Sequence, residues 1–104
     1  MNDCIFCKIA SGEIKSEFVY ESENTFVIKD LNPKAKTHLL LITKKHYENL
    51  DAMNDTTLAG EILNSIHEVT KKLGIQDNYR IQINNGKGAG QEVFHLHIHI
   101  LSNK

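Results

Sequence analysis

Polar and apolar residues alternate from 94 to 100, with histidine at 95, 97 and 99 and large apolar residues between, and the pattern ends on a further apolar residue at 101. A period of two is typical of a β-strand, whose successive side chains point to opposite faces. The pattern therefore predicts a strand that sends its leucine and isoleucines into a core. Its other face carries three histidines roughly 6.6 Å apart: His95, His97 and His99.

Four further segments are rich in β-branched or alternating apolar residues and predict strands: 18–21, 25–28, 37–43 and 79–83. A polar turn separates the first two, which predicts an antiparallel hairpin. The third is almost continuously apolar, which favours a central position in a sheet. With the histidine strand, the pattern predicts an antiparallel sheet of about five strands.

Helical spacing of apolar residues predicts a short helix at 4–10 and a main helix at 55–73. Asp55 or Thr56 is expected to cap the start of the main helix, and Gly74 to end it. The order helix, two strands, strand, helix, two strands predicts an α+β fold in one domain, residues 1–104.

Charge and composition limit the classes of ligand. The 104 residues include 12 Lys and Arg against 13 Asp and Glu, a net charge of −1, so a small molecule is favoured over a nucleic acid polymer or an anionic membrane. No apolar run approaches the roughly 18 residues of a membrane span, and the start of the chain lacks the pattern of a signal peptide. We therefore expect an intracellular, cytoplasmic protein.

Three of the six histidines stand in register on one strand, and this points to chemistry. Neutral imidazole acts near neutral pH as a nucleophile, a proton carrier or a metal ligand. Cys4 and Cys7 add a C-x-x-C pair, for which a zinc site, thiol redox chemistry and two unligated thiols all stay open.

Other candidates have a structural and a functional interpretation. Asp30 precedes Pro33 by three residues and suits a turn, but its carboxylate could also accept two hydrogen bonds from a ribose diol. Residues 84–91 carry three glycines in a loop without the P-loop pattern; they allow either a flexible hairpin or close approach to a phosphate. An apolar patch of Ile5, Phe6 and Ile9 suits a core or a base-binding wall.

The histidine strand and its flanking segments resemble the histidine triad (HIT) superfamily, in particular its Hint-like branch. The similar segments are 4–9, 29–31, 37–46 and 90–93, followed by the alternating histidines. The resemblance implies a HIT-like fold and a homodimer whose two sheets continue into one. It also implies a purine nucleotide-binding hydrolase that forms a nucleotidyl-histidine intermediate and cleaves nucleoside 5′-phosphoramidates to AMP or GMP.

The resemblance also assigns roles to residues of this sequence. His97 is expected to be the nucleophile, His99 to contact the phosphate or the leaving group, and His38 to support the triad by hydrogen bonds, unless it is only a core histidine. The nucleotide is expected to contact Ile5, Phe6, Ile9, Ile28, Asp30, Leu31, Asn84, Gly90, Gln91, Glu92, Val93, His97 and His99. Because a carboxylate repels phosphate, the side chain of Glu92 is expected to turn away and its N–H to bind. A structural zinc ion would be held by Cys4, Cys7, His46 and His95.

Two alternatives remain at this stage. The chain could be a non-catalytic module that binds nucleotide or zinc, or an enzyme whose substrates are dinucleoside polyphosphates. The expected partners are purine nucleoside monophosphate derivatives and a second copy of the chain.

Overall fold

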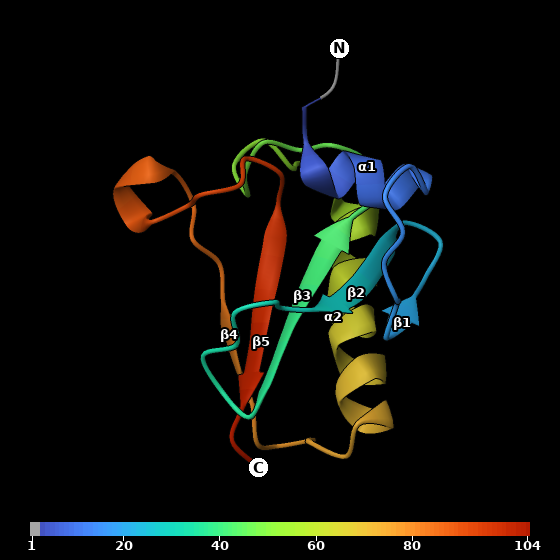
Figure 1. Cartoon of the computed structure of the whole chain (residues 1–104), viewed down its shortest axis with the longest axis vertical. Helices are drawn as coiled ribbons and strands as arrows, with labels where there is room; N and C mark the ends of the chain where they lie inside the picture. The colour runs from blue at the N-terminus through green and yellow to red at the C-terminus, as the bar shows by residue number, and fades with distance from the viewer. Residues whose placement is uncertain (1–2) are drawn as a thin grey trace.

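The sheet contains five antiparallel strands, as predicted, in a computed structural model that describes residues 3–104. The strands are β1 (Tyr20–Glu21), β2 (Thr25–Lys29), β3 (Thr37–Thr43), β4 (Arg80–Gln82) and β5 (His97–Ser102). Their spatial order is β1-β2-β3-β5-β4, so β5 lies between the central strand and an edge strand (Figure 1). The prediction that the chain has no signal peptide rests in part on Met1 and Asn2. These two residues lie outside the described part of the structure.

Two α-helices begin and end close to the predicted residues. Cys4 is the N-cap of α1 (Ile5–Ser11), and Asp55 caps α2 (Thr56–Lys72) by accepting two backbone N–H bonds. Gly74 follows α2 with a φ of +70°, a left-handed conformation that favours glycine at the end of a helix. A short 3₁₀ helix, η1 (Lys87–Ala89), was not predicted and lies in the glycine loop.

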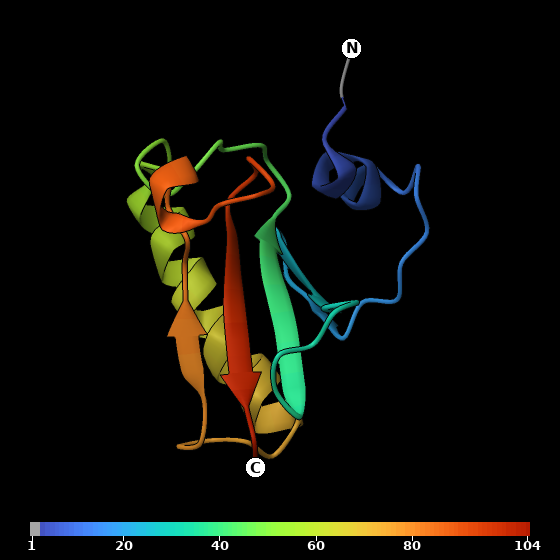
Figure 2. The ribbon, with the colours of Figure 1, turned by 60° about the vertical axis from the view of Figure 1, so that its left-hand side comes forward.

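The two faces of the sheet pack against different helices. Figure 2 shows α2 against one face and α1 on the opposite side, near one end of the sheet. The α2 side contains the larger apolar cluster, with Val27, Leu39, Leu41, Leu58, Ile62, Ile66, Val69, Ile75, Ile98 and Ile100. The α1 side contains a smaller cluster of Phe6, Ile9, Phe26, Ile28, Leu40 and Ile42. The smaller cluster leaves room on its face for polar side chains.

The register of β3 with β5 places histidines on this second face. Leu40 pairs with His99 and Ile42 with His97, while His38 pairs with Leu101. Opposite residues of an antiparallel pair share a face, so all three histidines lie on the side of α1.

The histidine strand begins later than predicted. β5 starts at His97, so His95 is not part of its row, and the backbone N–H of Leu96 donates to the carbonyl of Tyr47 at 2.7 Å. This bond joins the segment before β5 to the segment that follows β3. β1 and β4 are also shorter than the predicted segments 18–21 and 79–83, by loss of their outer residues.

Candidate functional site

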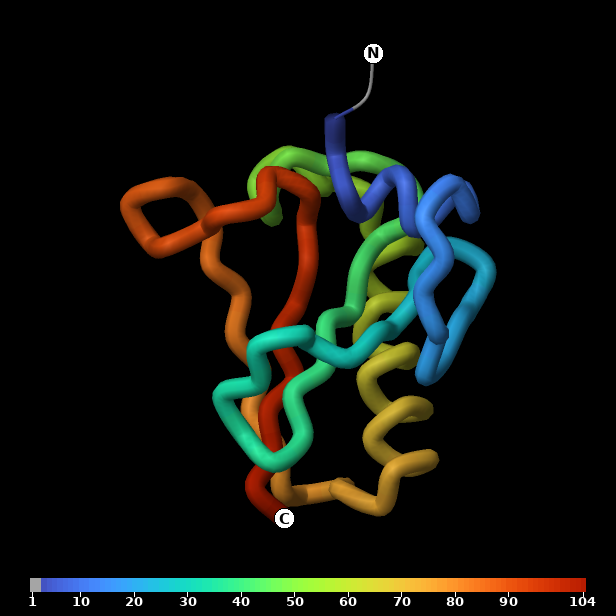
Figure 3. Tube along the Cα trace, viewed as in Figure 1, coloured from blue at the N-terminus to red at the C-terminus, as the bar shows by residue number. Residues whose placement is uncertain are grey.

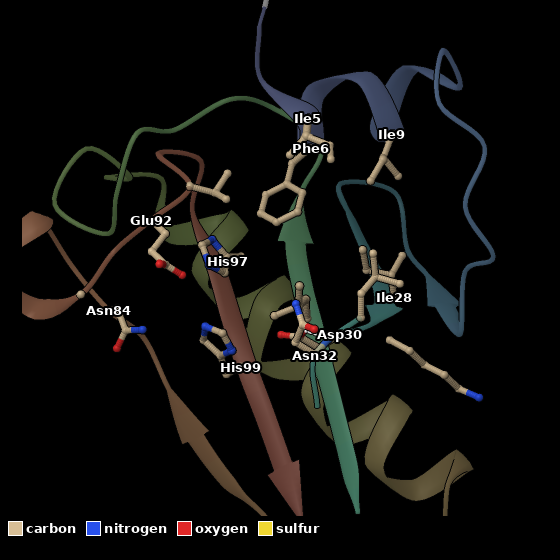
Figure 4. A pocket seen from close by; sticks show the side chains of 15 residues that line it. Ile5, Phe6, Ile9, Ile28, Asp30, Asn32, Asn84, Glu92, His97 and His99 are labelled. Atoms are coloured by element: carbon tan, nitrogen blue, oxygen red, sulfur yellow. Dashed lines mark hydrogen bonds between the residues drawn. The ribbon is translucent and has the colours of Figure 1, made fainter. Parts of the chain in front are cut away.

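A pocket of about 300 Å³ lies on the α1 face of the sheet, between α1, β2, β5 and the loop that precedes β5 (Figure 4). It contains most of the residues that the sequence predicted to contact nucleotide. They are Ile5, Phe6, Ile9, Ile28, Asp30, Leu31, Asn84, Gly90, Glu92, Val93, His97 and His99. Lys29, Asn32 and Leu40 also line the pocket and were missed. The sequence reveals neither the register of β2 with β3, which places Lys29 and Leu40, nor the path of the segment after β2, which places Asn32.

One wall of the pocket is apolar. Phe6 and Ile9 on α1 and Ile28 on β2 are buried in the smaller core cluster and also line the pocket, so the two interpretations of the α1 patch are both met. Ile5 and Leu31 are more open, and Leu31 is 95% exposed. A planar ring can pack against such a wall and exclude water from it.

His97 is held with a defined orientation. Its Nδ1 lies 2.7 Å from the backbone carbonyl oxygen of His95, which can only accept, so Nδ1 carries the hydrogen in the neutral ring. Nε2 then bears the unshared electron pair. The edge of Phe6 contacts the ring, with centroids 5.1 Å apart, and the imidazole extends into the pocket (Figure 4).

His38, His99 and Asp30 form a hydrogen-bonded chain beside His97. The backbone N–H of Lys34 donates to Nδ1 of His38, so the hydrogen of the neutral His38 ring lies on Nε2. That nitrogen is 2.9 Å from Nδ1 of His99 and 3.3 Å from a carboxylate oxygen of Asp30. His99 therefore accepts at Nδ1, and its remaining hydrogen lies on Nε2.

The surroundings of His99 favour the neutral form of its ring. Burial lowers its pKa, the nearby His97 and His38 lower it further, and the carboxylate of Asp30 opposes the shift. A neutral imidazole with hydrogen on Nε2 donates one hydrogen bond without adding a positive charge.

Asp30 also forms a turn. One carboxylate oxygen accepts from the N–H of Asn32 at 2.8 Å, and the other lies near His38. Each oxygen retains a second acceptor site for a ligand. Turn formation and ligand binding are thus compatible at this residue.

The glycine loop uses several N–H groups internally. Those of Gly90 and Gln91 donate to the carbonyls of Lys87 and Gly86. Gln91 is buried, and its amide bridges the carbonyls of Glu48 and Val93, so it fixes the loop and does not line the pocket. The prediction that Gln91 contacts nucleotide is therefore not matched by its placement. In the described part of the chain, the N–H groups of Glu92 and Val93 donate no hydrogen bond within the protein.

Glu92 differs from expectation in its orientation. Its carboxylate points into the space beside His97 and Asn84 (Figure 4), although it was expected to turn away from the site. The residue is exposed, so water screens the charge. The side chain therefore belongs to the surface that a ligand would meet.

A separate group of four residues, outside the pocket, could hold a metal ion. The ligand atoms of Cys4, Cys7, His46 and His95 all lie within 4.8 Å of one another. Nδ1 of His95 is 3.1 Å from Sγ of Cys4, 3.4 Å from Sγ of Cys7 and 3.1 Å from Nδ1 of His46. Ligand atoms around a tetrahedral ion with bonds of 2.0–2.3 Å are separated by roughly 3.3–3.8 Å, so the arrangement fits such an ion.

His95 is prepared for this role. Its Nε2 donates to the carbonyl of Thr43 at 2.6 Å, which leaves the electron pair on Nδ1 among the other ligand atoms. Burial lowers the pKa of His95, with smaller contributions from His46 and His97, and favours the neutral form that binds metal. The side chain is fully buried.

Comparison with known proteins identifies the family. The HIT domain family matches residues 11–104, and the chain therefore belongs to that family. It is 48% identical over 103 residues to protein HitA of Neisseria gonorrhoeae, with 97% of this chain and 96% of that protein covered. It is 50% identical over 100 residues to an uncharacterized HIT-like protein of Methanocaldococcus jannaschii, covering 94% and 77% of the two chains.

Solved structures agree with the fold. A histidine triad protein from Clostridium difficile has a TM-score of 0.92 and 44% identity, with 100% of this chain and 93% of that chain covered. A HIT family hydrolase from Legionella pneumophila has a TM-score of 0.91 and 39% identity, covering 98% and 94%. Within residues 3–104, no helix has the length and apolar character to cross a membrane.

Proposed function

We propose that this protein is a nucleotidyl hydrolase that cleaves purine nucleoside 5′-phosphoramidates through a covalent intermediate on His97. The observation that carries the proposal is the bond from Nδ1 of His97 to the carbonyl of His95, which leaves Nε2 as an uncharged nucleophile in the pocket. The resemblance to the Hint-like branch and the similarity to a HIT family hydrolase support it.

The pocket can accommodate each part of such a substrate. The apolar wall of Phe6, Ile9 and Ile28 suits a purine, and Asp30 suits the ribose hydroxyls. The phosphate would lie between His97, His99 and the N–H groups of Glu92 and Val93. Donors aimed at its non-bridging oxygens stabilise the charge that develops during transfer.

The reaction proceeds in two halves. The electron pair on Nε2 of His97 forms a bond to phosphorus, the P–N bond of the substrate breaks, and the leaving nitrogen keeps that pair and takes a proton from solvent. Water then attacks the phosphorus, the bond to His97 breaks, and the water loses a proton to solvent. The proton taken up in the first half is returned in the second, and the products are the amine and a nucleoside monophosphate.

His99 and His38 support both halves. The hydrogen on Nε2 of His99 can be donated to a phosphate oxygen or to the leaving nitrogen, while His38 fixes the ring from its other side. Because His38 binds the backbone at Lys34, its own ring cannot turn without losing a hydrogen bond.

We further propose that the Cys4, Cys7, His46 and His95 group holds a structural zinc ion. When bound, zinc would supply a fixed tetrahedral link and no part of the hydrolysis. The ion would join α1, which supplies the apolar wall, to the segment just before β5. Ligation by two thiolates also favours a reducing, cytoplasmic location.

A homodimer is the proposed assembly. β4 is an edge strand whose three residues are exposed, and beside it an apolar groove lies between α2 and the sheet. The groove is formed by Leu50, Met53, Ala59, Ile62, Leu63, Ile66, Ile81, Ile83, Leu96 and Ile98. A second copy that pairs its own β4 there would extend the sheet and cover both apolar surfaces.

The proposal is tested by turnover of adenosine 5′-phosphoramidate by the purified protein, with release of AMP and ammonia as the expected result. Binding of AMP without turnover would favour the alternative of a non-catalytic nucleotide-binding module. Faster hydrolysis of dinucleoside polyphosphates than of phosphoramidates would favour the alternative substrate class.

A further inference from the structure

A second cavity, of about 320 Å³, continues from the nucleotide pocket along β5. The two share Asp30, Asn32, Asn84, Glu92 and His99, so they meet at the place where the phosphate would lie. The remainder of the second cavity runs away from His97, toward Leu101 and the edge strand β4. A leaving group displaced from phosphorus would occupy this direction.

The far end of this cavity carries two cations that have no role in the proposed reaction. Arg80 comes from β4 and Lys34 from the segment between β2 and β3, which crosses in front of β3 and β5 (Figure 3). Neither makes an ion pair within the described residues. Both are exposed in the single chain. In the proposed dimer, Arg80 would stay on the His99 face of the sheet, opposite the apolar groove that contains Ile81, because Arg80 pairs with Leu101.

Two acidic residues also line the cavity, but they do not neutralise this end. Asp30 belongs to the part that the two cavities share, whereas Arg80 and Lys34 line the second cavity alone. Glu92 lies at the opposite end, beside His97 and Asn84 (Figure 4). The cavity is thus negative near the reacting phosphorus and positive farther out.

The strand register sets the separation of the two ends. Gln82 pairs with His99, and Arg80 pairs with Leu101, so Arg80 lies two residues farther along the sheet than His99. Two residues of a strand span roughly 6.6 Å. His38, which receives the N–H of Lys34, pairs with Leu101 from the other side.

We infer that this cavity is the leaving-group subsite and that Arg80 and Lys34 recognise an anionic group carried by the leaving amine. The inference rests on the proposed phosphoramidase function and deepens it. An amine whose carboxylate lies a few bonds from the nitrogen places its nitrogen near Glu92 and His99 and its anion near the cations. A polyphosphate chain fits less well, because it would add further negative charge beside Glu92, next to that of the reacting phosphate.

The experiment compares three substrates that share the adenosine phosphoryl group and differ in the amine that leaves. They are the unsubstituted phosphoramidate, the N-ethyl phosphoramidate and the N-carboxymethyl phosphoramidate. The values of kcat/KM are measured for the wild type, Arg80→Gln, Lys34→Gln and Arg80→Lys. Lys71→Gln is the matched control, because it removes an exposed cation from α2, away from this cavity.

The wild type should prefer the N-carboxymethyl over the N-ethyl substrate by about tenfold or more, since hydrogen bonds to charged groups are among the stronger ones. Arg80→Gln should reduce that ratio by about tenfold and Lys34→Gln by less. Arg80→Lys should restore most of it, and Lys71→Gln should leave it unchanged. Diadenosine tetraphosphate, measured in parallel, should show no comparable dependence on Arg80.

Equal use of the N-carboxymethyl and N-ethyl substrates by the wild type, with no effect of Arg80→Gln on the ratio, would overturn the subsite. So would a loss on Arg80→Gln confined to diadenosine tetraphosphate, because the anion recognised would then be a phosphate chain. Failure of the wild type to hydrolyse even the unsubstituted phosphoramidate would instead refute the proposed function, so the two failures are distinguishable.

Discussion

Nε2 of His38 lies 2.9 Å from Nδ1 of His99, and the hydrogen bond between them sets the protonation of both rings. Because the N–H of Lys34 occupies Nδ1 of His38, the hydrogen between the two rings belongs to His38. His99 then presents its own hydrogen to the pocket. A backbone amide on one side of the sheet thereby determines which atom of His99 meets a substrate.

Replacement of His38 by alanine should lower kcat for adenosine 5′-phosphoramidate by about ten- to hundredfold, because His99 loses the donor that fixes its ring and its tautomer. KM should change much less. The measurement is steady-state kinetics with His67→Ala as the control, since His67 is exposed on α2. An unchanged kcat in His38→Ala would make His38 a core histidine without effect on the reaction.

Asp30 should make the protein selective for ribose. A charged acceptor contributes about 1.5–3 kcal/mol per hydrogen bond, so AMP should bind roughly ten- to a hundredfold more tightly than 2′-deoxy-AMP. Asp30→Asn should reduce this difference. Calorimetric titration of both nucleotides measures this difference. Equal affinities in the wild type would mean that Asp30 forms the turn and does not bind the ribose.

The stability of the protein should fall in mild acid, partly through His99. Burial lowers the pKa of His99 below its ordinary value of 6.5. At a pH between the lowered pKa and 6.5, the unfolded chain therefore binds more protons than the folded one. The stabilisation linked to this group is complete above pH 6.5 and decreases as the pH falls through the lowered pKa.

Thermal unfolding at pH 8 and pH 5.5 measures this decrease in stability. His99→Gln should lose less stability from pH 8 to pH 5.5 than the wild type, and His67→Gln should lose as much as the wild type. A pH dependence in His99→Gln identical to that of the wild type would contradict the assignment.

The proposed zinc site should be measurable without reference to activity. Elemental analysis should find about one zinc ion per chain in the wild type and little in Cys7→Ser. Removal of the ion should cost about 3 kcal/mol when zinc exceeds its dissociation constant a hundredfold, which lowers the Tm by roughly 10–20 °C. A metal-free wild type with a Tm unaffected by a chelator would remove zinc from the account.

Local sequence patterns were sufficient for much of the fold. The alternation around His97 and His99 predicted their common face, and Asp55 and Gly74 marked the ends of α2, because these signals depend on near neighbours. The departure of His95 from the strand was not predicted. His95 contacts Cys4 and Cys7, and the next residue, Leu96, bonds to Tyr47; all three partners are distant in the sequence.

The sequence predicted those residues of the candidate site whose functional group itself indicates a role in catalysis or binding. The histidines and Asp30 could be named from their functional groups and from the family resemblance. Leu40 lines the pocket because of the strand register, and Gln91 does not line it because its side chain bonds to Glu48 and Val93. Arg80 lines the second cavity because it pairs with Leu101. Such placements depend on tertiary structure.

His97→Ala addresses the central claim at the level of binding. The variant should lose turnover of adenosine 5′-phosphoramidate while its affinity for AMP stays within about tenfold, because the nucleophile acts in the transition state. Turnover above a few per cent of the wild-type rate would be incompatible with nucleophilic attack by His97.

The most direct measurement is mass spectrometry of wild-type protein quenched in acid-free denaturant within milliseconds of mixing with adenosine 5′-phosphoramidate. The account predicts a transient mass increase of one adenylyl group that maps to His97 and is absent from His97→Ala. Steady release of AMP with no adduct, or an adduct that persists in His97→Ala, would contradict it.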